Sequence, residues 1–166
     1  MTAAHWYHAA AEKGNADAQC NLGYCYIQGK GVKKNESEAV HWYTLAAKQG
    51  DAKAQNNLGV CYERGMGVAK NESEAVRWYT LAAKQGDAYA QYNLGVCYNN
   101  GIGVAKNESE AVRWYTLSAK QGNTNAQYNL GVCYARGIGV AKNESEAVRL
   151  YTLAANQGDA YAQYNL

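Results

Sequence analysis

The sequence lacks long apolar runs, proline and a strong net charge, and each absence excludes a class of protein. No stretch approaches the ~18 consecutive apolar residues that a membrane-spanning helix needs. The net charge is only +2 with both signs interspersed, so no surface for nucleic acid or an acidic membrane is indicated. The first residues show no basic segment followed by an apolar run, so we do not expect a signal peptide there. With 15 Tyr, 4 Trp, no Pro and a hydrophobic share of 48%, the chain should be ordered.

What the chain does contain is one phrase of 36 residues, written several times. Full rows cover residues 15–50, 51–86, 87–122 and 123–158. Residues 1–14 match the second half of a row, and residues 159–166 match the start of one. Because no linker or change of composition separates the rows, we expect a single repeat array over residues 1–166.

The first half of each row predicts a helix, which we call helix A. In the row 51–86, Asp51 is a good N-cap, and Leu58, Cys61 and Tyr62 follow at helical spacing. Gly65 then begins a glycine-containing loop that can adopt positive φ.

The second half of each row predicts another helix, helix B. In the same row Asn71 can cap it, Glu74 can complete a capping box, and Gly86 suits the position after its end. Such a pair of helices cannot bury its apolar face alone. Stacked rows should therefore form an all-α fold, an α-solenoid of 36-residue antiparallel helix pairs.

The letters of these rows resemble a known family. "AQNNLGVCYERGMGV", followed by "EAVRWYTLAAKQGD", is similar to the Sel1-like repeat, a relative of the tetratricopeptide repeat. The resemblance covers the whole chain. It implies a right-handed superhelix with helix A on the concave side, and an adaptor or scaffold role in binding other proteins.

The rows also differ from one another, and the differences gather on one face of helix A. The variable columns begin at Asp17, Cys20, Tyr24, Ile27 and Gln28 and recur in later rows. At ~100° per residue they fall in a stripe about 100° wide, whereas helix B hardly varies. An exposed face that simply drifts would explain this variation, but the stripe is rich in Tyr, a residue that is enriched at interfaces.

We therefore predict a ligand-binding groove on the helix A face. A constant Asn column beside the stripe could hold a peptide backbone, or could instead bond across the interface between helices A. We expect Tyr89, Tyr92 and Tyr128 to be anchors, and replacing Tyr92 and Tyr128 by Ala to lower affinity while leaving the Tm nearly unchanged. The candidate residues are Tyr24, Lys53, Asn56, Asn57, Glu63, Arg64, Tyr89, Tyr92, Asn93, Asn99, Asn100, Asn125, Tyr128, Asn129, Arg136, Tyr161 and Tyr164.

No pattern indicates catalysis, a metal or a cofactor. Cys25, Cys61, Cys97 and Cys133 form one column at a spacing too wide for disulfides, so we expect them to be small buried hydrophobes. The cysteine pairs of the family's secreted members are absent, which favours a reducing cytoplasm. A secreted or periplasmic location would require a signal peptide outside this chain.

The predicted function is thus a non-enzymatic scaffold that binds a protein or peptide, without nucleic acid or membrane insertion. Two alternatives stay open. Tyr and Asn also suit sugars, so the surface could bind carbohydrate or act as a hydrolase, as proposed for β-lactamase-like relatives. The array could also be purely architectural and associate with itself through uncapped repeat ends.

Overall fold

The computed structural model describes residues 3–166, and every regular element within them is an α-helix. First helices, which correspond to helix A, alternate with second helices, which correspond to helix B. The first helices are α2 (Ala16–Gln28), α4 (Ala52–Arg64), α6 (Ala88–Asn100), α8 (Thr124–Arg136) and α10 (Ala160–Tyr164). The second helices are α1 (Ala3–Glu12), α3 (Glu36–Lys48), α5 (Glu72–Lys84), α7 (Glu108–Lys120) and α9 (Glu144–Asn156).

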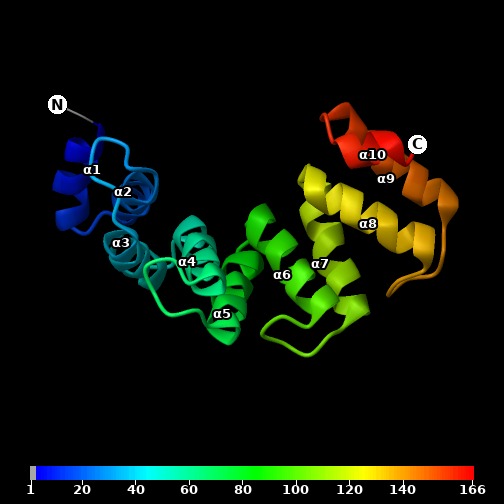
Figure 1. Cartoon of the computed structure of the whole chain (residues 1–166), viewed down its shortest axis with the longest axis horizontal. Helices are drawn as coiled ribbons and strands as arrows, with labels where there is room; N and C mark the ends of the chain where they lie inside the picture. The colour runs from blue at the N-terminus through cyan, green and yellow to red at the C-terminus, as the bar shows by residue number, and fades with distance from the viewer. Residues whose placement is uncertain (1–2) are drawn as a thin grey trace. The chain divides into compact units, whose positions relative to one another are not determined.

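Contacts divide the chain into two units, which we describe separately. Unit 1 runs from Met1 to Gln85 and unit 2 from Gly86 to Leu166. Within each unit, a first helix lies beside the second helix that follows it in the chain (Figure 1). In the described residues, no helix combines the length and apolarity that crossing a membrane requires.

The helix starts confirm the predicted N-caps. The Asp51 carboxylate accepts from the Ala54 N–H at 2.6 Å, and the Asn71 side chain accepts from the Glu74 N–H at 3.1 Å. The reciprocal half of the predicted capping box does not form. The Asn71 N–H donates to the Tyr62 carbonyl at 2.9 Å, while the Glu74 carboxylate pairs with Arg77 at 3.2 Å.

Close contact between paired helices explains the constant glycine of the "NLG" phrase. A Cβ built on Gly59 of α4 would stand 2.6 Å from the ring of Tyr79 in α5. The same geometry recurs in unit 2, where a Cβ on Gly95 would stand 2.6 Å from the ring of Tyr115. Glycine is required because the tyrosine ring lies directly against the backbone of the first helix.

In each unit, a second contact joins a loop to the preceding second helix. Gly67 has φ +67° and lies against the Glu36 carbonyl and the Ser37 N–H, where no side chain fits. In unit 2, Gly139 lies in the same way against Glu108. The second glycine of the loop is thus fixed by packing between successive repeats.

Buried glutamines supply a third constant contact. In unit 1 the Gln55 side chain donates to the Ala47 carbonyl at 3.1 Å and accepts from Gln85 at 2.8 Å. In unit 2, Gln127 donates to the Ala119 carbonyl at 3.3 Å and accepts from a later glutamine at 2.8 Å. A buried amide without a hydrogen-bond partner would destabilise the fold. These bonds therefore fix the register of neighbouring helices.

Candidate functional site on the first helices

The predicted residues all lie on surfaces that solvent reaches, fully or in part. The exposed ones are Tyr24, Lys53, Arg64, Tyr89, Asn100, Asn125, Arg136, Tyr161 and Tyr164. The half-buried ones are Asn56, Asn57, Glu63, Tyr92, Asn93, Asn99, Tyr128 and Asn129.

The column at the start of each first helix is the most exposed part of this surface. Its members are Asp17, Lys53, Tyr89, Asn125 and Tyr161, and each of them is exposed. Tyr89 is 68% exposed and Tyr161 is 73% exposed. Exposed side chains whose chemical type differs between rows therefore lie beside the constant packed residues. We call this column the leading column.

Two tyrosines of the next column, Tyr92 and Tyr128, face partly inward, toward the core. The Tyr92 ring lies 6.1 Å from the ring of Tyr115, and the Tyr128 ring lies 5.8 Å from the ring of Tyr151. Both tyrosines pack against the hydrophobic clusters of unit 2. Replacing Tyr92 and Tyr128 by Ala should therefore lower the Tm, contrary to our expectation from the sequence, because packed rings would be removed.

Tyr128 also joins the core to the exposed column. Its ring lies 6.0 Å from that of Tyr161, so an α8 side chain and an α10 side chain form an aromatic pair. Farther along unit 2, the Asn99 amide donates to Asn100 at 3.0 Å, and Arg136 is exposed at the end of α8. The helix A face of unit 2 thus consists mainly of aromatic and amide groups.

The corresponding face of unit 1 is more strongly charged. Lys53 and Arg64 are exposed on α4. Glu63 has a structural contact, since its carboxylate accepts the Tyr79 hydroxyl at 2.7 Å. A residue chosen as a ligand contact therefore also satisfies the polar end of a core tyrosine.

The constant Asn column makes contacts between helices. The Asn57 amide lies 4.0 Å from the Cys20 sulfur of the preceding first helix. The Asn129 side chain interacts with the Tyr115 hydroxyl of the preceding second helix. These two contacts account for the constancy of Asn57 and Asn129 without a ligand.

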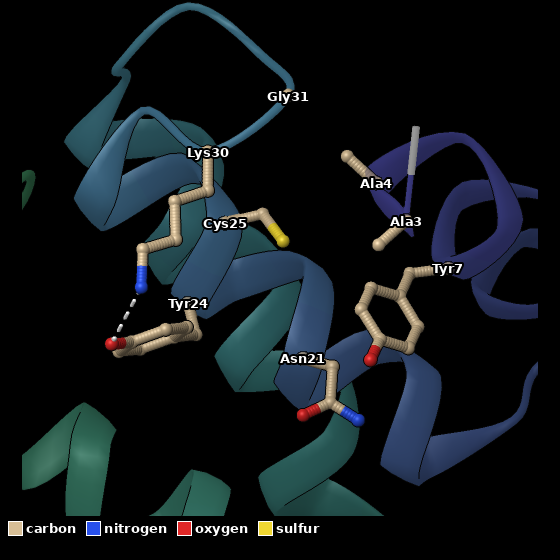
Figure 2. A pocket seen from close by; sticks show the side chains of 8 residues that line it. All are labelled: Ala3, Ala4, Tyr7, Asn21, Tyr24, Cys25, Lys30 and Gly31. Carbon is tan, nitrogen blue, oxygen red and sulfur yellow. Dashed lines mark hydrogen bonds between the residues drawn. The ribbon is translucent and has the colours of Figure 1, made fainter. Parts of the chain in front are cut away.

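Unit 1 also contains a cavity beside α2. About 480 Å³ in volume, it lies between α1 and α2, with Asn21, Tyr24 and Cys25 on one side (Figure 2). The Lys30 ammonium donates to the Tyr24 hydroxyl at 3.4 Å, and it lies 5.0 Å from the ring centroid. Figure 2 shows the Tyr7 ring of α1 opposite Asn21.

The residues of this cavity that lie outside helix A were not among the predicted site residues. Tyr7 belongs to a second helix and Lys30 to a loop, whereas the predicted site residues all come from helix A. The signal that could have found Lys30 is its own departure from the rows, since the equivalent positions hold Met66, Ile102 and Ile138.

The constancy of the polar residues on the second helices has structural causes. Glu72 pairs with Lys70 at 2.8 Å and Glu74 with Arg77 at 3.2 Å, while the Thr80 hydroxyl donates to the Val76 carbonyl at 2.7 Å. The first helices therefore vary on their exposed face, whereas the polar side chains of the second helices are constrained by ion pairs and hydrogen bonds.

The thiols are buried and poorly suited to chemistry. Burial raises the pKa of Cys61 and of Cys133 to about 11, and that of Cys20 to about 12. At neutral pH these groups are thiols rather than the thiolates that act as nucleophiles. Among residues 3–166, no cluster of His, Cys, Asp and Glu has an arrangement that could hold a metal ion.

Comparison with protein families identifies the repeat. The model of the Sel1 repeat matches residues 2–15, 16–51, 52–87, 88–123 and 124–159. These matches cover nearly the whole chain. No curated protein matches it.

Solved structures agree with this match. The chain is 41% identical to a Sel1 repeat protein from Oxalobacter formigenes, with a TM-score of 0.89 over 96% of this chain and 63% of that one. It is 39% identical to a protective antigen of uropathogenic Escherichia coli that displays an SLR fold, with a TM-score of 0.93 over 98% of this chain. It spans only 35% of that antigen.

A more distant likeness shows the fold alone. An immunity protein from Pseudomonas aeruginosa is 24% identical, with a TM-score of 0.65 over 97% of this chain and 58% of that one. Together with the all-helical elements, these neighbours confirm the predicted fold class, an all-α solenoid of repeated helix pairs.

Proposed function

Because this chain belongs to the Sel1-repeat family, whose members generally act as non-catalytic protein-interaction scaffolds, we propose that it binds a protein or peptide on the helix A face. The observation that carries the proposal is the leading column. Its residues are exposed in every row and differ in chemistry between rows, whereas the residues beside them are packed.

The chemistry of unit 2 suits an extended peptide. Tyr89 and Tyr161 offer broad rings that lose little conformational entropy on binding. Asn125 adds an exposed amide, which can both donate to and accept from a peptide backbone. Arg136 offers a positive charge that would favour an acidic group of the partner.

The chemistry of unit 1 suits a polar partner surface. Lys53 and Arg64 present two cations from α4, and the Tyr24 ring with Lys30 borders the cavity shown in Figure 2. The cysteines are buried thiols, which fits a reducing compartment, and we propose the cytoplasm as the location.

The proposal is tested with a peptide selected on the folded chain from a displayed random library, and affinity is then measured by fluorescence polarisation. Tyr89→Ala with Tyr161→Ala should raise Kd about tenfold or more, because exposed tyrosines are frequent hot spots. The Tm should hardly change, since both rings are exposed. Trp6→Ala is the matched control, because Trp6 is an exposed aromatic residue on a second helix.

Two results would contradict the proposal. One is an unchanged Kd in the double tyrosine variant. The other is an equal loss of affinity in Trp6→Ala, which would place the peptide on a second helix.

A further inference from the structure

The second helices of unit 2 contain one departure from the rows that opens a pocket. The column occupied by Trp6, Trp42, Trp78 and Trp114 holds leucine at position 150 of α9. A pocket of about 530 Å³ lies there, bordered by α7, α8 and α9. This volume is within the roughly 300–1,000 Å³ range typical of ligand sites.

Unit 1 contains a matched site in which the indole is present. Two rows before Leu150, Trp78 packs against the hydrophobic cluster that includes Ala47 and Leu58. The other lining residues of the unit 2 pocket have the same identity at the equivalent positions in unit 1. Those equivalents include Thr44, Ala47, Lys48, Gln55, Leu58 and Tyr62.

Loss of the indole leaves its neighbours less covered. Ala119 is 8% exposed in unit 2, whereas its equivalent Ala47 is 2% exposed. Leu130 is 4% exposed, whereas Leu58 is 0% exposed. Leucine therefore does not fill the space that tryptophan fills, as expected when a large core residue is replaced and the surroundings relax only partly.

The rim of the pocket carries charges suited to an acidic ligand. In unit 1 the Arg77 guanidinium lies 5.5 Å from the Trp78 ring. Arg77 also makes one bond to the Glu74 carboxylate, of 3.2 Å, whereas Arg149, which has no indole beside it, makes two bonds to the Glu146 carboxylate, of 2.8 and 2.6 Å. Lys120 supplies a further positive charge to the same rim.

The environment of Trp78 in unit 1 also indicates how an aromatic ring would be bound in the unit 2 pocket. In unit 1 the Trp78 indole nitrogen is buried without a hydrogen-bond partner among the described residues. The site therefore recognises the shape and apolar faces of the ring rather than its N–H group. Arg149 can stack on such a ring, as Arg77 does.

From these observations we propose that the unit 2 pocket binds a planar aromatic acid of indole size. Its ring takes the place of the missing indole, between Ala119, Leu130 and Leu150. Its acidic group lies at the rim near Lys120. This site is separate from the helix A face and does not depend on the proposed function.

The test uses 5-fluoroindole-3-acetate and ¹⁹F NMR titration of the intact chain. The wild type should bind one molecule per chain, with a Kd on the order of 1 mM or tighter, given the apolar area of an indole ring. Leu150→Trp should weaken binding at least tenfold because the chain's own indole fills the pocket. Trp78→Leu should create a second, matched site and raise the stoichiometry to two.

The rim is tested in the same titration. Lys120→Ala should weaken binding of the acid several-fold at low salt, where exposed charges are least screened. 5-Fluorotryptamine, which carries a cation on the same ring, should bind more weakly than the acid. The proposal is overturned if Leu150→Trp binds the acid as the wild type does, if folded Trp78→Leu keeps a single site, or if the amine binds more tightly.

Discussion

Units 1 and 2 share their packed residues, yet they present different chemistry to solvent. Gly59 lies against Tyr79 in unit 1 just as Gly95 lies against Tyr115 in unit 2. The leading column, by contrast, changes from Asp17 and Lys53 in unit 1 to aromatic and amide groups in unit 2. Contacts inside the repeat determine the residue at some positions and leave other positions variable. At the variable positions, two units of the same fold can acquire different binding partners.

The largest expected effect comes from disrupting the contact between glycine and tyrosine that both units share. Gly95→Ala should destabilise the protein by about 2–3 kcal/mol, because the added Cβ overlaps the Tyr115 ring and overpacking costs that much. Gly59→Ala should cost a similar amount in unit 1. Urea unfolding followed by circular dichroism measures both. Asn100→Ala, on an exposed position of α6, is the control and should stay within about 0.5 kcal/mol.

A smaller effect sharpens the difference between Trp78 and Leu150. Trp78→Leu should cost about 2 kcal/mol, because a packed indole is lost. Leu150→Trp should stabilise by about 1 kcal/mol, because filling a cavity is usually favourable. Thermal unfolding of the two variants and of their combination measures both changes. A Leu150→Trp variant less stable than the wild type would show that the unit 2 pocket does not accept the indole.

The smallest effect concerns the hydroxyls of the core tyrosines. Tyr79→Phe should cost about 1.5 kcal/mol, since it removes a hydrogen bond to the Glu63 carboxylate. Tyr115→Phe should cost about 1 kcal/mol, because its partner Asn129 is uncharged. In a double-mutant cycle, Glu63→Ala should cancel most of the effect of Tyr79→Phe. If the two costs simply added, the hydrogen bond would contribute nothing to stability.

The repeat architecture could be predicted from the sequence because its signals are local. Row length, the capping residues Asp51 and Asn71 and the helical spacing of Leu58 and Cys61 depend on neighbours within a few residues. The helices begin where these signals indicate. The failed half of the capping box depended on a distant group, the Tyr62 carbonyl, which takes the Asn71 N–H.

The site could be predicted only in part, for a similar reason. Periodicity places Tyr89 and Tyr92 on one stripe, but it does not predict which of the two rings packs against Tyr115. The bond from Tyr79 to Glu63 joins two helices, and row comparison cannot detect it. Leu150 was visible as a departure from a tryptophan column, but the pocket became evident only once its surrounding residues were placed in space.

The most direct test of the central claim is a map of where the selected peptide binds the ¹⁵N-labelled chain. Amide chemical shifts should change most at the exposed helix A residues, such as Tyr89, Asn125 and Tyr161, and little along the second helices. Shifts concentrated on exposed second-helix residues such as Trp6 or Val148 would contradict the claim that the variable first-helix face is the binding surface.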